Sequence, residues 1–215
     1  MYTLHNSNLD VVTEYKYLGV VLNNKLTWDS HVEYVITKAN KMLGFITSVG
    51  RDLCQNAKLA LYKALVLPIL EYGQPVWHLH TSVLVDKIEA VQRRATRMVL
   101  GQRRMEMDHD NRLKLLNWSS LKLRRKFLSM SYVMKALYGF ITCNVVRQDI
   151  SVNGRHADTV RFNHLRARTR RLHCSTVNVF PRYWDELPES LRSGVVGLSF
   201  QAWANLLRCH VCYSQ

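Results

Sequence analysis

The stretch TSVLVDKIEAVQRRATRMVL, residues 81–100, decides the fold class. Its apolar side chains recur three or four positions apart, which is the period of one face of a helix. These side chains are Leu84, Ile88, Val91, Ala95, Met98 and Val99. Gly101 follows directly and suits the left-handed conformation that ends many helices. We therefore predict an amphipathic helix from about Thr81 to Leu100.

The same period continues on both sides of this helix. Further helices are predicted over residues 32–46, 56–67, 111–116, 120–138 and 199–208. Pro68 should end or kink the second of these, because proline has no amide hydrogen and crowds the preceding turn. Residues 2–4 and 9–22 are rich in strand formers and are separated by turn formers. The prediction is a mainly α fold: an N-terminal β-hairpin, a helical bundle, and an irregular basic C-terminal tail with a short final helix.

The net charge of the chain limits the classes of partner that it is expected to bind. The 215 residues carry a formal net charge of +14, and 47% of them are hydrophobic, which excludes a fully disordered chain. A protein this basic usually has a polyanionic partner, most often nucleic acid. The five cysteines are odd in number and unevenly spaced, which favours a reducing compartment over a secreted disulfide scaffold. With no apolar run long enough for a membrane span and no signal peptide, we expect an intracellular protein, nuclear or cytoplasmic, without membrane contact.

Three basic clusters are candidate nucleic-acid contacts. Arg93, Arg94 and Arg97 lie three or four positions apart on the helix of residues 81–100 and are expected to share a face. Guanidinium groups bind phosphates in a bidentate way, without reading sequence. The alternative is a solvated basic face, which is the commoner role of a charge run.

The second cluster includes Lys122 and Arg125, with the same two interpretations. The third is an arginine-rich stretch in which Phe162 and two histidines are interleaved, a composition suited to RNA. Its candidates are Arg166, Arg168, Arg170 and Arg171. A disordered basic linker has the same composition.

Catalytic and metal-binding patterns are weak. Two-metal nucleotidyl transfer needs paired carboxylates, and no Asp-Asp dipeptide occurs in the sequence. The acidic residues around His109 are expected to form a solvated, partly ion-paired loop. Cys209 and Cys212 have C-x-x-C spacing, but a structural zinc ion needs four ligands. We therefore predict no catalytic residue, no metal ligand and no cofactor in this chain.

Several segments, in order, resemble one family. They are KYLGV (16–20) with LTW (26–28) and His31, KANK (38–41) with LG (43–44), LPILEYGQPVW (67–77), IEAVQRRATR (88–97) and FPRYWDELP (180–188). Together they resemble the region after the palm in non-LTR, LINE-type reverse transcriptases of the jockey and chicken-repeat branch. Asp185 stands where the terminal signature of that branch usually has asparagine.

The resemblance implies a division of the chain and a function. Residues 1–28 would end the palm, with Tyr17, Leu18 and Gly19 in the primer-grip hairpin. Residues 29–101 would form the thumb, 102–140 the C-terminal helices, and 141–215 a basic loop and an aromatic, helical tail. The expected partners are primer–template RNA or DNA and the palm and fingers of the parent polymerase, which would use Mg²⁺. An inert remnant and a domesticated protein-interaction module are the alternatives.

Overall fold

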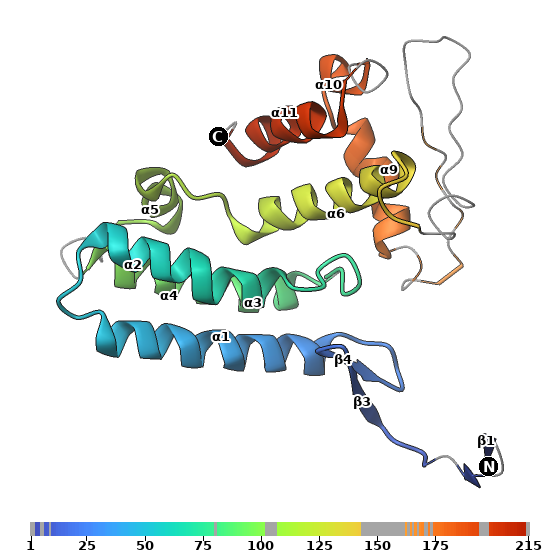
Figure 1. Cartoon of the computed structure of the whole chain (residues 1–215), viewed down its shortest axis with the longest axis horizontal. Helices are drawn as coiled ribbons and strands as arrows, with labels where there is room; N and C mark the ends of the chain where they lie inside the picture. Colours follow the sequence, from blue (N-terminus) through green and yellow to red (C-terminus); the bar gives the residue numbers. More distant parts are fainter. Residues whose placement is uncertain are drawn as a thin grey trace.

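The computed structural model describes residues 3–4, 7–8, 10–79, 81–101, 107–142, 162, 164, 166, 168–169, 172, 174–193 and 198–213. Over these residues the chain is mainly helical, with short antiparallel hairpins at its N-terminal end, which confirms the predicted fold class (Figure 1). The strands are β1 (Thr3–Leu4), β2 (Ser7–Asn8), β3 (Glu14–Tyr17) and β4 (Val20–Asn23). The helices are α1 (Asp29–Val49), α2 (Gln55–Leu61), the π-helical η1 (Tyr62–Val66), α3 (Leu67–Glu71), α4 (Ser82–Leu100), α5 (His109–Leu116), α6 (Leu121–Leu137), α9 (Thr176–Asp185), α10 (Glu189–Ser193) and α11 (Phe200–Tyr213).

One hydrophobic core lies between α1, η1, α3 and α4. Its fully buried side chains include Val32 of α1, Tyr62 of η1 and Ile88 of α4. Helices α1 and α4 run parallel, because Glu33 pairs with Lys87 and Asn40 with Arg94, 54 positions along the chain in both cases. This core gathers the apolar stripes that the sequence predicts for the first three long helices.

A second core joins the C-terminal helices to α6. Helices α9, α10 and α11 bury Phe180, Trp184, Leu187 and Trp203 against the second half of α6. Helix α6 serves both cores, because Leu121 at its start belongs to the first. The aromatic cluster around Trp184 thus anchors the C-terminal helices on α6.

Most of the run of residues 9–22, predicted as one β-rich segment, is a hairpin that spans residues 14–23 in the structure. Strand β3 pairs with β4 from Glu14 opposite Asn23 to Tyr17 opposite Val20. Leu18 and Gly19 form the turn with φ values of 45° and 83°. Two positive φ angles give a two-residue turn whose twist matches that of the strands.

Pro68 reshapes a helix rather than ending it. It lies at the first turn of α3, and the π-helical segment η1 leads directly into it. A proline cannot donate the hydrogen bond that an α-helix requires, and a wider π turn is one way to absorb that loss. The helical path therefore continues to Glu71, four residues beyond the predicted end.

Several boundaries differ from the predictions. Helix α1 begins at Asp29, three residues before the predicted start, so Ser30 lies inside it, and the Ser30 hydroxyl donates to the Glu14 carboxylate of β3. Helix α6 begins close to its predicted start, with Ser120 as the cap that accepts a hydrogen bond from the Leu123 amide. Helix α9 was not predicted, because Pro181 lies inside it and argues locally against a helix. No helix in the described part of the chain has the length and apolarity of a membrane span.

Candidate nucleic-acid interface

The three arginines predicted as nucleic-acid contacts on α4 differ in their exposure and in their hydrogen bonds. Arg94 is exposed and donates to the Asn40 side chain of α1 at 2.9 Å. Arg93 is half-buried and donates to the Asp86 carbonyl oxygen at 3.2 Å. Arg97 is exposed near the end of α4, and no hydrogen bond or ion pair holds its guanidinium among the described residues. Arg94 therefore lies on the side of α4 that borders α1, whereas Arg97 extends from the exposed surface near the end of α4.

Lys122 lies close to Arg93 rather than to the other two arginines. Both residues line a surface pocket of about 440 Å³ together with Glu89 and His109. The Lys122 amide donates to the Glu89 carboxylate at 2.7 Å, while its side chain is exposed. Burial raises the pKa of Glu89 and lowers that of His109. Asp86, Glu89 and Asp110 all line this pocket, which makes it a poorer phosphate site than the surface around Arg94 and Arg97.

Arg125 is a correction to the predicted set. It is buried, and its guanidinium lies over the Trp77 ring, 4.6 Å from the ring centroid. Burial lowers its pKa to about 10. The neighbouring cations are paired, Arg124 with Glu71 and Lys126 with Glu186. Arg125 therefore has no surface for a phosphate, and Lys122 is the unpaired cation of its cluster within the described residues.

The arginine-rich stretch is described only in part. Arg166 and Arg168 are exposed, and Arg170 and Arg171 lie outside the described residues. Phe162, expected to interleave with the arginines, is instead buried against Phe180 and Trp184, with ring centroids 4.8 and 4.9 Å away. Its ring is thus part of the second core and cannot stack on a base.

The predicted primer-grip residues form the tip of the β3–β4 hairpin. Tyr17 and Leu18 are exposed, and the Tyr72 hydroxyl donates to the Leu18 carbonyl oxygen at 2.9 Å. Gly19 lies against the Tyr72 ring, because a Cβ added at Gly19 would lie 3.3 Å from Tyr72 Cε1. The hairpin is thus docked on the helical body through its turn.

Replacing Gly19 should loosen this docking. We expect Gly19→Ala to lower the free energy of unfolding by about 1–2 kcal/mol, since alanine is strained at positive φ. Urea denaturation followed by circular dichroism measures the change. Gly44→Ala is the matched control, because a Cβ at this helical glycine would meet nothing within 4 Å. A helical Gly→Ala change should stabilise by up to about 1 kcal/mol, so equal effects of the two substitutions would contradict the assignment.

The two cysteines with C-x-x-C spacing and the acidic residues around His109 lie on or next to helices. Cys209 is exposed and Cys212 is buried on α11, and burial raises the pKa of the Cys212 thiol, which opposes the thiolate that zinc requires. No three potential metal-ligating side chains come together among the described residues. The acidic stretch is partly helical instead of a loop, since Asp108 caps α5 by accepting from the Asp110 amide.

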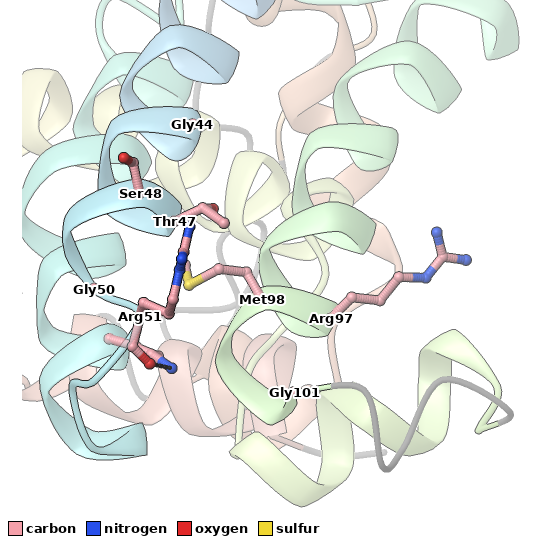
Figure 2. Close-up of a pocket in the computed structure, with 9 residues that line it drawn as sticks. Gly44, Thr47, Ser48, Gly50, Arg51, Arg97, Met98 and Gly101 are labelled. Atoms are coloured by element: carbon pink, nitrogen blue, oxygen red, sulfur yellow. Dashed lines mark hydrogen bonds between the residues drawn. The ribbon is translucent and has the colours of Figure 1, made fainter.

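Further cations near the end of α4 were not predicted from the sequence. Arg51 and Lys58 follow α1 and line a surface pocket together with Arg97 and Met98 (Figure 2). They are isolated in the sequence, so no cluster pointed to them.

Comparison with known proteins identifies relatives. The chain is 30% identical over 89 residues to the probable RNA-directed DNA polymerase from transposon X-element of Drosophila melanogaster, covering 40% of this chain and 10% of that protein. It is 31% identical over 106 residues to the RNA-directed DNA polymerase from mobile element jockey of Drosophila funebris, covering 46% and 11%. The probable polymerase from transposon BS of D. melanogaster is 28% identical over 94 residues, covering 42% and 10%.

These matches confirm the resemblance to non-LTR retrotransposon polymerases. The matched part is about a tenth of the length of these relatives. No protein-family model matches the chain, and no solved structure matches it.

Proposed function

We propose that this relative of retrotransposon RNA-directed DNA polymerases is a nucleic-acid-binding segment of such an enzyme. In this proposal the helices of residues 29–101 form the thumb, which holds the primer–template duplex. The β3–β4 hairpin is the primer grip, next to the palm and fingers of a parent polymerase that uses Mg²⁺. Because the sequence contains no Asp-Asp dipeptide, the proposal gives these 215 residues no polymerase activity of their own.

The observation that carries the proposal is the pair of exposed arginines on α4, Arg94 and Arg97. Arg97 is exposed and unpaired among the described residues, and Arg94 is held only by a neutral amide, so both are free to meet phosphates. Such contacts give affinity without sequence preference.

A salt titration tests the proposal. We expect the chain to bind RNA–DNA and DNA duplexes of unrelated sequence with similar affinity. If roughly four phosphates are contacted, affinity should fall about a hundredfold between 50 and 200 mM salt through counterion release. Fluorescence anisotropy of a labelled duplex measures this. Absent binding, or binding that salt does not weaken, would contradict the proposal.

The double variant Arg94→Ala with Arg97→Ala ties the binding to this surface. It should make the salt dependence less steep by roughly one to two in the logarithmic slope. Lys63→Ala with Lys114→Ala removes the same charge from two exposed lysines that line other pockets, beside Trp118. This control should bind almost as the wild type does.

A further inference from the structure

A surface pocket lies where α1 and α4 end. It encloses about 540 Å³ and is lined by three cations, Arg51, Lys58 and Arg97, and by the hydroxyls of Thr47 and Ser48. Among the described residues no carboxylate lines it; Asp52, next to Arg51 in the chain, is not one of its lining residues. A Cβ added to Gly44 in its wall would meet nothing within 4 Å, so the space beside the α1 backbone is open.

Figure 2 shows how its side chains are arranged. The Arg51 side chain lies in the gap between Thr47 and Met98, whereas the Arg97 guanidinium points away, along the outer side of α4. Lys58 Nζ lies 3.5 Å from the Arg51 carbonyl oxygen, which is at the limit of a hydrogen bond. Arg51 and Lys58 thus share the pocket, and Arg97 flanks it on the surface.

The partial negative charges at the helix C-termini disfavour an anion here, but they are smaller than the positive charge of the side chains. The C-terminal ends of α1 and α4 meet at the pocket, and each contributes a partial charge of about −0.5. The three side chains contribute three full positive charges. The balance is therefore clearly positive.

These cations differ in their partners from three basic residues elsewhere in the described part of the molecule. Lys87, Arg124 and Lys126 are each ion-paired with a glutamate. Within the described residues, no carboxylate pairs with Arg51, Lys58 or Arg97. A cluster of unpaired cations around an open hollow repels itself, and an anion relieves that repulsion.

We propose that this pocket binds a phosphate group of a nucleic-acid strand, with Arg51 and Lys58 as its principal ligands. The proposal rests on the proposed function and refines it, because it moves the main phosphate contact from the middle of α4 to the hollow beside its end. The phosphate belongs either to the backbone of the strand or to its 5′ end, and the chemistry of recognition is the same.

The test compares the double variant Arg51→Ala with Lys58→Ala and the charge-matched control Lys63→Ala with Lys114→Ala. Each is titrated by fluorescence anisotropy with one duplex carrying either a 5′-phosphate or a 5′-hydroxyl. We expect the pocket variant to lose about tenfold in affinity and about one unit of logarithmic salt slope, while the control loses less than about twofold. A loss on both duplexes identifies a backbone phosphate, and a loss on the 5′-phosphorylated duplex alone identifies a terminal one. Equal losses in the two double variants, or none in the pocket variant, would overturn the proposal.

A second measurement separates this proposal from the proposed function. Thermal melting is compared in sodium phosphate and in sodium chloride of equal ionic strength. Phosphate should raise the Tm of the wild type and of the control more than that of the pocket variant. If the wild type binds no duplex but shows this difference, the proposed function fails and the phosphate site stands. If all three proteins respond equally, the site fails.

Discussion

Trp184→Ala should lower the free energy of unfolding by about 3–5 kcal/mol, the range for deleting a large buried aromatic side chain. Trp184 is fully buried in the second core, stacked on Trp203 with ring centroids 6.1 Å apart and edge-on to Phe162. Its removal leaves a cavity shared by α6, α9 and α11, whose rings cannot all move in to fill it. Urea denaturation followed by circular dichroism measures the loss.

Two further variants make this result specific. Trp184→Phe keeps one ring and should cost much less than alanine does. Phe45→Ala removes an aromatic side chain that is 58% exposed on α1, so it should change stability by about 0.5 kcal/mol or less. If Trp184→Ala and Phe45→Ala had similar effects, Trp184 would not anchor the tail.

The helices that were predicted well are specified by residues within or next to the helix itself. Helix α4 has a long apolar stripe and ends at the predicted Gly101, which has a φ of 73° but a ψ of 178° instead of the left-handed helical value. Helix α6 is capped by Ser120, the first residue of the helix predicted over residues 120–138. An apolar period and a cap act within a few residues, so a single sequence is enough to place them.

The basic cluster of α6 shows why the interface was harder to predict. Lys122, Arg124, Arg125 and Lys126 form one patch in the sequence, but a helix turns about 100° per residue, so they point around its whole circumference. Arg124 meets Glu71, 53 positions away, and Lys126 meets Glu186, 60 positions away. Such partners come from tertiary packing, which no local pattern contains.

Residue patterns alone did not place the turn of the β3–β4 hairpin or the basic pocket, for related reasons. A leucine at positive φ, as at position 18, is uncommon, so the residue types there do not indicate a turn. Arg51 and Arg97 lie at the ends of two helices that only the fold makes parallel neighbours.

His31 joins the hairpin to the first core, and its protonation should unfold that junction. The ring is buried, 1% exposed, edge-on to Trp77 with centroids 4.8 Å apart. Its Nδ1 accepts a hydrogen bond from the Val21 amide of β4 at 3.2 Å, so that nitrogen carries no proton. Burial, with a smaller contribution from the Arg125 charge, lowers its pKa from 6.5 to about 4.

Stability should therefore fall as pH drops from about 6.5 to about 4. In this window the unfolded chain protonates His31 and the folded chain does not, so acid favours the unfolded state. At 1.36 kcal/mol per pKa unit, the loss from this residue is at most about 3 kcal/mol. His31→Asn keeps a short acceptor for the Val21 amide but cannot titrate, so its stability should depend less on pH than that of the wild type across this window. Urea denaturation of both proteins at several pH values between 7 and 4 measures the difference, and parallel curves would show that His31 is not the titrating link.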